Sequence, residues 1–459
     1  MKVFSKLSGL ASASRQLGSA AIVVLLAFTS AVAIAAPKPK YFVDEAKLPF
    51  EALPGATAYF GVHARAGYRI EVPDDWNGGL VVYAHGFRGT GPELTVDNHP
   101  LRPLLIPQGY AWAASSYDRN DYDISSGVKS SHALIGKFTG LVGTPSRIYM
   151  TGASMGGHIT AVAIEQYPNL FDGALPFCGV MGDYAMFDYF LDFNLAAQQL
   201  GTGSSTYPVA TNLNETINYL FGTVPAIKSN LEAFSGGWPT ALNPQGQQLK
   251  NLAEIQSGGD RPNFDEAWFF WNSPPEVGGA GANFLFELAI GDGSFPRAPG
   301  SAVDNIDTTY QFDADPELSP EEETLNTYIF RLAAEPQTRR KQGLAQIPTI
   351  SGDINIPVLT LHNLGDLFVP VLNQVEYQKR VSANGQSDLL VQRAIRGVVH
   401  CDFTPQELGR AFVDLATWVE FGVKPEGDDF SDPAAVADSS FGCEFTDGFH
   451  YLGTACPAP

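Results

Sequence analysis

A serine between glycines is the residue of this sequence with the clearest potential for chemistry. Residues 151–158 read TGASMGGH, so Ser154 stands in a G-x-S-x-G pattern. A strand-like run, Arg147–Met150, precedes it, and an apolar run of helical character, Ile159–Ile164, follows it. A strand, a tight turn and then a helix push a serine hydroxyl out at the top of a sheet, where it can act as a nucleophile. The alternative is a glycine-rich loop that carries an ordinary surface serine.

A nucleophilic serine needs a base to take its proton and a carboxylate to orient that base. His400 lies between a predicted strand, 389–395, and a predicted closing helix, 405–421, so we predict that it is the base. Asp366 follows another predicted strand, 356–361, and we predict that it is the orienting carboxylate.

Two other aspartates, Asp183 and Asp402, also lie after predicted strands and need to be considered. Asp183 is a rival acid, because a carboxylate one strand earlier can also reach the base. Asp402, beside the predicted base, is expected to cap the closing helix instead.

The developing oxyanion needs hydrogen-bond donors. The backbone N–H of Met155, directly after the nucleophile, is the natural first donor. The second is expected from the turn His85-Gly86-Phe87, through the N–H of Phe87. In this interpretation His85 anchors its own turn.

These residues must be positioned by a sheet. Short apolar runs at 80–84, 110–117 and 174–177 are typical of buried parallel strands, and helical runs alternate with them. From about residue 181 to 350 the alternation is lost, and it resumes afterwards. We interpret this segment as a lid inserted after the sixth strand, with a second independent domain as the alternative.

The amino terminus is typical of a secretory signal peptide. Lys2, Lys6 and Arg15 precede the apolar run Ala20–Ala36, which contains a small-x-small cleavage site, Ala33–Ala35. Retention of this segment as an anchor is the alternative. We therefore expect a secreted or periplasmic protein with no stable membrane insertion after cleavage. The net charge of −21 argues against nucleic acid as a partner.

Four cysteines in an exported chain suggest two disulfides. Cys443 and Cys456 lie close together in the tail, and we pair them. Cys178 ends a predicted strand and Cys401 adjoins His400, so a bridge between them would tether the histidine loop to the sheet. Two free buried thiols are the alternative for this second pair.

Four segments give the chain its resemblance to the α/β-hydrolase superfamily, and to secreted bacterial serine esterases in particular. They are YRIEVPDDWNGGLVVYAHGFRG, YMTGASMGGHITA, IPVLTLHNLGDLFVPV and GVVHCDFTPQE, within residues 40–180 and 350–425. The resemblance implies an α/β-hydrolase fold, a mostly parallel sheet with helices on both faces and a large lid. It also implies the chain order serine, acid, histidine. Tannases and feruloyl-esterase-like enzymes join a cysteine beside the serine to one beside the histidine. Here Ala153 precedes Ser154, and Cys178 takes the place of the missing partner.

The expected divisions of the chain are a signal peptide (1–35), a first core section (36–180), a lid (181–350), a second core section (351–425) and a disulfide-bearing tail (426–459). Within the lid, the aromatic run at 265–271 either walls an acyl pocket or forms the core of its own subdomain. The four aspartates Asp304, Asp307, Asp313 and Asp315 resemble a loose cation site, but a solvated acidic loop is the favoured interpretation.

The predicted function is hydrolysis of carboxylic esters through an acyl-enzyme, with no cofactor and no metal. A polymeric or plant-derived ester would suit an exported enzyme. One alternative is a serine peptidase that acts on short peptides. The other is a non-catalytic binding protein on a hydrolase scaffold.

Overall fold

The structure is a computed structural model that describes residues 40–457 apart from 296 and 340–343. The predicted signal peptide, 1–35, lies outside the described residues. Within the described part of the chain, none of the helices combines the length and the apolar character that a membrane span requires.

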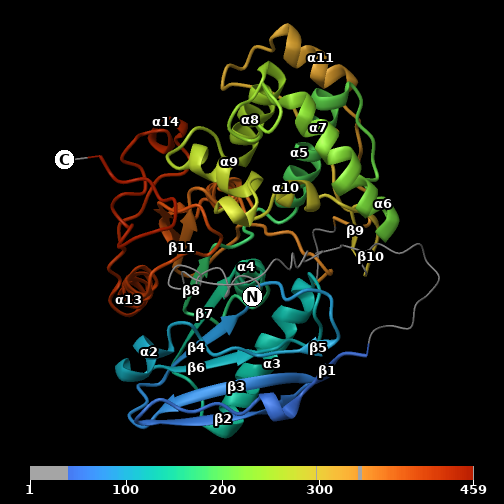
Figure 1. The fold of residues 1–459 in the computed structure, drawn as a ribbon. Helices are drawn as coiled ribbons and strands as arrows, with labels where there is room; N and C mark the ends of the chain where they lie inside the picture. Colours follow the sequence, from blue (N-terminus) through green and yellow to red (C-terminus); the bar gives the residue numbers. More distant parts are fainter. Residues whose placement is uncertain (1–39, 296, 340–343, 458–459) are drawn as a thin grey trace.

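An eight-stranded sheet runs from the middle of the molecule to its lower edge in the view of Figure 1. Its strand order is β12-β11-β8-β7-β4-β6-β3-β2. The strands are β2 (Ala56–His63), β3 (Ala66–Pro73), β4 (Gly79–Ala84), β6 (Ala111–Ser115), β7 (Arg147–Ala153), β8 (Gly173–Phe177), β11 (Val358–Asn363) and β12 (Leu390–Ile395). β3 pairs antiparallel with β2 and β6, and all other neighbours are parallel. This is the α/β-hydrolase fold that the sequence predicts.

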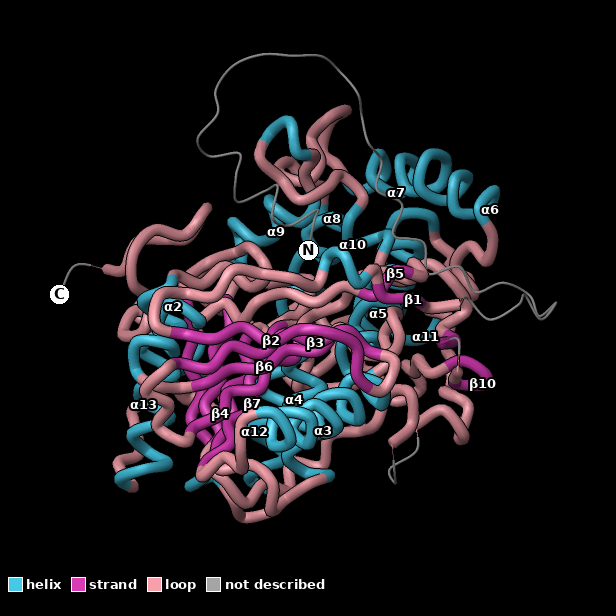
Figure 2. The backbone as a smooth tube through the Cα atoms, turned by 90° about the horizontal axis from the view of Figure 1, so that it is seen from below, coloured by secondary structure: helices cyan, strands magenta, loops and turns pink. Residues whose placement is uncertain are grey.

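Helices cover both faces of the sheet, and every residue of β4 is therefore buried. Leu80 and Val82 pack into one hydrophobic cluster, while Val81 and Tyr83 pack into the other. The first cluster lies under α3 (Ile124–Leu141), α4 (Met155–Gln166) and α12 (Leu372–Ala383), and the second under α2 (Arg102–Leu105) and α13 (Pro405–Phe421). Figure 2 shows α3, α4 and α12 grouped along one face of the strands.

The segment between β8 and β11 lies on one side of the sheet, and most of its regular elements are helices joined by long loops (Figure 1). Its elements are α5 (Tyr184–Thr202), α6 (Leu213–Asn218), η4 (Tyr219–Thr223), α7 (Val224–Leu231), α8 (Pro244–Ser257), α9 (Phe264–Asn272), η5 (Pro275–Val277), α10 (Phe284–Glu287), β9 (Ser294–Phe295), β10 (Ala298–Ser301) and α11 (Pro320–Tyr328). Its buried side chains join the same hydrophobic cluster as α3 and α4. The insertion therefore shares a core with the sheet. The exact divisions of the chain stay predictions.

Smaller elements complete the fold. They are β1 (Phe42–Val43), which pairs with β5 (Glu93–Leu94), the short helices η2 (Glu45–Lys47), η3 (Ile106–Gln108) and η6 (Ser387–Leu389), and α14 (Pro433–Val436) in the tail. Two disulfides join Cys178 to Cys401 and Cys443 to Cys456. These are the pairings that the sequence analysis predicts, and every cysteine is used.

Candidate active site

Ser154 stands at a strained turn between β7 and α4, with φ 57° and ψ −122°. Glycine is required around it because the backbone is crowded. A Cβ on Gly152 would lie 2.0 Å from the carbonyl oxygen of Gly156, and one on Gly156 would lie 2.0 Å from that of Ala84. The local geometry is thus the tight strand-turn-helix that the G-x-S-x-G pattern predicts.

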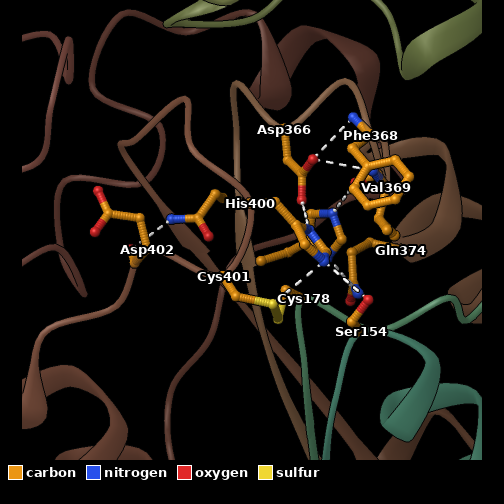
Figure 3. Close-up of a disulfide and its surroundings, with 11 residues drawn as sticks. Ser154, Cys178, Asp366, Phe368, Val369, Gln374, His400, Cys401 and Asp402 are labelled. Carbon is orange, nitrogen blue, oxygen red and sulfur yellow. Dashed lines mark hydrogen bonds and ion pairs between the residues drawn. A yellow bond between two sulfur atoms is a disulfide. The ribbon is translucent and has the colours of Figure 1, made fainter. Parts of the chain in front are cut away.

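Three predicted side chains from distant parts of the chain meet at this turn (Figure 3). His400 Nε2 lies 2.9 Å from Ser154 Oγ, and His400 Nδ1 lies 2.5 Å from Asp366 Oδ2. The Asp366 side chain is fully buried, and its other oxygen accepts hydrogen bonds from the backbone N–H groups of Phe368 and Val369. The carboxylate is therefore fixed on the side of the imidazole that faces away from the serine.

The two predicted oxyanion donors lie on segments that touch the serine. Met155 is the first residue of α4, so its N–H belongs to the open amino end of that helix. A Cβ on Gly86 would lie 3.1 Å from Ser154 Cβ, which brings the turn that carries Phe87 against the nucleophile. Their role as donors stays a prediction.

His85 holds this turn and does not compete as a base. Its Nδ1 lies 2.7 Å from the carbonyl oxygen of Gly86, and its ring stacks on Tyr117 at 3.9 Å. The Tyr117 hydroxyl donates to the His85 carbonyl. Burial lowers the pKa of His85 well below its usual range, so the ring is neutral near pH 7. The predicted anchoring role of His85 is confirmed by these contacts.

Asp183, the rival acid, is engaged elsewhere. It caps α5 and lies 2.5 Å from Arg380 Nη1, and it accepts a hydrogen bond from the backbone of Ile350. Asp402 does not cap the closing helix, because Thr404 is the N-cap of α13. The prediction for Asp402 is wrong, and its carboxylate lies instead against His450.

The loops that carry His400 and Asp366 are tied together by contacts that the sequence does not reveal. Trp271 of α9 is buried, and its indole N–H donates to the carbonyl oxygens of Gly365 (2.9 Å) and Val398 (3.0 Å). The Asn363 amide donates to the carbonyl of Asp402 at 2.8 Å. The aromatic run of α9 is thus buried core, and one of its side chains links the acid loop to the histidine loop.

The Cys178–Cys401 disulfide lies beside the same imidazole, with Cys401 Sγ 3.4 Å from His400 Nε2 (Figure 3). Cys178 follows the end of β8, so the bridge joins the histidine loop to the sheet. Among the described residues, one group has metal-ligand spacing, and it consists of Cys178, His400 and Cys401. Both sulfurs are joined in the disulfide, so neither is a thiolate that could bind a metal ion.

The carboxylates of the acidic loop in the lid accept hydrogen bonds from backbone N–H groups. Asp304 accepts hydrogen bonds from the N–H groups of Ile306 and Ala334, and Asp313 accepts one from Asp315. The contacts with Ile306 and Asp315 stabilise turns, as aspartates commonly do, and the contact with Ala334 ties the loop to a more distant segment. They agree with the favoured interpretation of this loop.

Comparison with known proteins gives the same class. A model of the prolyl oligopeptidase family matches residues 108–220, the stretch that contains Ser154 and the strands around it. The chain is a serine hydrolase of the α/β-hydrolase class.

Relatives of this serine hydrolase have several activities. The chain is similar to o-phthalyl amidase of Xanthobacter agilis, with 23% identity over 426 residues, which are 82% of this chain and 89% of the amidase. It is 30% identical to acetylxylan esterase A of Aspergillus awamori over 129 residues, which are 25% of this chain and 42% of that esterase. A solved structure of feruloyl esterase B from Aspergillus oryzae aligns with a TM-score of 0.45 and 15% identity, covering 81% of this chain and 82% of the esterase.

Proposed function

We propose that this protein hydrolyses carboxylic esters through an acyl-enzyme formed on Ser154. The observation that carries the proposal is the continuous contact from Ser154 Oγ to His400 Nε2 and from His400 Nδ1 to Asp366 Oδ2. In the proposed reaction Ser154 Oγ attacks the ester carbonyl carbon while His400 takes the hydroxyl proton. Asp366 keeps the His400 ring in the required tautomer and stabilises the imidazolium.

The tetrahedral intermediate then collapses. Its oxyanion is held by the N–H groups of Met155 and Phe87, and His400 returns its proton to the departing alcohol. A water molecule then gives a proton to His400 and attacks the carbonyl carbon of the acyl-enzyme. The acid is released, and Ser154 Oγ takes the proton back from His400. Loss of one oxyanion donor typically costs about 3 kcal/mol of transition-state stabilisation.

Apolar rings beside the imidazole favour a substrate with an apolar or aromatic part. The Phe368 ring lies 5.1 Å from the His400 ring, and the Phe284 ring of the lid lies 5.4 Å from Phe368. Both phenylalanines are only partly buried, so they offer apolar surface. The name of the acetylxylan esterase relative supports a polymeric or plant-derived ester as the setting.

We also propose that the protein works in a secreted or periplasmic setting. Two disulfides and no free cysteine support an oxidising compartment.

Amide hydrolysis is the second candidate. It is favoured by the name of the relative that aligns with 82% of the chain, an amidase. The same three side chains serve both reactions, and the difference lies in protonation of the poorer leaving group.

A peptidase that grips a free amino terminus would need free carboxylates in the lid. Two carboxylates of α5, Asp188 and Asp192, are already engaged by Arg339 and the Tyr310 hydroxyl.

Matched leaving groups separate these candidates. The wild type is assayed on p-nitrophenyl acetate, butyrate and benzoate and on the corresponding p-nitroanilides. Ser154→Ala is the test variant, and Ser382→Ala on the exposed side of α12 is the control. We expect ester turnover to exceed anilide turnover and to be lost in Ser154→Ala alone. Equal or faster anilide turnover would assign the amidase function, and ester turnover that survives Ser154→Ala would remove the proposal.

A further inference from the structure

The C-terminal tail places a histidine behind the loop of the predicted base. His450 is 4% exposed. Its Nε2 lies 2.8 Å from Glu407 Oε1, and its Nδ1 lies 3.3 Å from Asp402 Oδ2. Asp402 is two residues beyond His400, and Glu407 lies in the first turn of α13. One side chain of the tail therefore contacts both the histidine loop and the helix in which that loop ends.

The residues that pair with His450, Asp402 and Glu407, also make other hydrogen bonds that hold the His400 loop. Glu407 accepts a hydrogen bond from the backbone N–H of Thr404 in a capping box, and a second from the N–H of Asp447 in the tail. The carbonyl of Asp402 is held by Asn363 at the end of β11. His450 completes a set of contacts that surrounds residues 400–407.

His450 is positively charged between the two carboxylates of Asp402 and Glu407. Burial alone would lower the pKa of His450, but hydrogen bonds and charge attraction from Asp402 and Glu407 raise it to about 9. The ring is therefore an imidazolium at neutral pH, and both of its N–H groups donate. Arg396, directly after β12, donates hydrogen bonds to the Ser439 carbonyl and the Thr454 hydroxyl of the tail.

His450 lies in a part of the tail that a disulfide closes into a loop. The Cys443–Cys456 disulfide closes a short loop, with a sequence separation of 13, that contains both Asp447 and His450. A closed loop loses less conformational freedom when it docks than an open tail does. The tail disulfide therefore limits the conformational freedom of the loop that carries His450.

We propose that His450 is a positioning residue: from the tail it holds the His400 loop through Asp402 and Glu407, and so keeps His400 Nε2 within reach of Ser154. This inference rests on the proposed catalytic role of Ser154 and His400. Its physical basis is the sensitivity of proton transfer to geometry, since a displacement of about 1 Å can cost up to about 100-fold in rate.

The experiment compares Asp402→Asn and His450→Gln with the wild type. Asp402→Asn is the milder change, because the Asp402 carboxylate is partly exposed and pairs with the His450 side chain. The control is His132→Gln, an exposed histidine of α3. Active sites are counted by fluorophosphonate labelling, and kcat for p-nitrophenyl butyrate is measured per labelled site from pH 6 to pH 10.5.

We expect kcat per labelled site to fall by roughly 10-fold to 100-fold in His450→Gln, with KM nearly unchanged. In the wild type kcat should decline as the pH rises through about 9, where His450 loses its proton. In Asp402→Asn this decline should move to lower pH, because one of the two stabilising carboxylates is gone. The control should follow the wild type.

A purely structural role would lower the melting temperature or the yield but leave kcat per labelled site and its pH profile unchanged. That result in both variants would overturn the inference. Failure of the proposed function has a different signature, since the wild type itself would then show no labelling at Ser154 and no ester turnover.

Discussion

The two disulfides of this chain should differ strongly in their contribution to stability. The perturbation is the paired change Cys178→Ser with Cys401→Ser, compared with Cys443→Ser and Cys456→Ser. The first bridge joins residues separated by 223 positions and the second joins residues separated by 13. The chain-entropy relation then gives a loss of about 5 kcal/mol for the first pair and about 3 kcal/mol for the second.

The assay is urea unfolding at pH 7, followed by tryptophan fluorescence, on the wild type and both double variants. Refolding from urea is checked first, because a chain of this size need not unfold in two states. The midpoint should fall in both variants, and further for the long-range pair. That variant should also lose kcat per labelled site, because Cys401 adjoins His400.

Two results would refute this reasoning. One is a larger loss of stability from the tail pair than from the long-range pair. The other is a loss below about 1 kcal/mol for the long-range pair, which would mean that the unfolded chain gains little freedom when the bridge is removed.

Four further outcomes follow from the site. Asp366→Asn should lower kcat by about 10⁴-fold. Asp183→Asn should mainly lower the unfolding midpoint. Steady-state kinetics and thermal melts, measured on both variants, distinguish the catalytic effect from the structural one. Gly86→Ala should lower kcat in a folded protein, because its added Cβ would lie 3.1 Å from the Cβ of the nucleophile; circular dichroism checks the fold. Trp271→Phe keeps an aromatic side chain but replaces the indole with a smaller ring and removes the N–H donor to two buried carbonyls, so urea unfolding should show a loss of about 1–3 kcal/mol. In the folded protein the pKa of His450 is raised to about 9, above the ordinary value of 6.5. The stabilisation that protonated His450 provides is therefore complete below pH 6.5 and is lost as the pH rises through 9. Melting temperatures between pH 6 and pH 10 should fall more steeply in the wild type than in His450→Gln.

The parts of the fold that the sequence predicts well are those governed by local rules. The run 80–84 is apolar at every position and becomes β4, buried on both faces. The turn at Ser154 follows from its glycines, each of which faces backbone atoms at 2.0 Å when a Cβ is added. His400 and Asp366 are predictable because each follows a recognisable strand.

Other elements depend on packing that a single sequence does not display. Helix α3 is rich in serine and glycine, which are poor helix formers. It is stabilised by close packing on α4: a Cβ on Gly127 would lie 2.2 Å from Ile159 Cδ1, so only a small residue fits there. Strand β2 has a half-exposed pattern at the sheet edge and gives little signal.

The long-range contacts around the site were also hidden. Asp183 is separated from Arg380 by 197 positions, and Trp271 from Val398 by 127. Such pairings arise from the way the lid packs against the second core section. The sequence offers candidates for the reacting groups, whereas the residues that hold them emerge only from the fold.

Direct detection of the covalent intermediate tests the central claim most sharply. The protein is mixed with p-nitrophenyl butyrate at low pH, where deacylation is slow, and is quenched in acid for intact-mass and peptide mass spectrometry. We predict a single butyryl group, located on the peptide that contains Ser154 and absent from Ser154→Ala. An unmodified protein that still releases p-nitrophenol in a burst, or a butyryl group on another residue, would contradict the account.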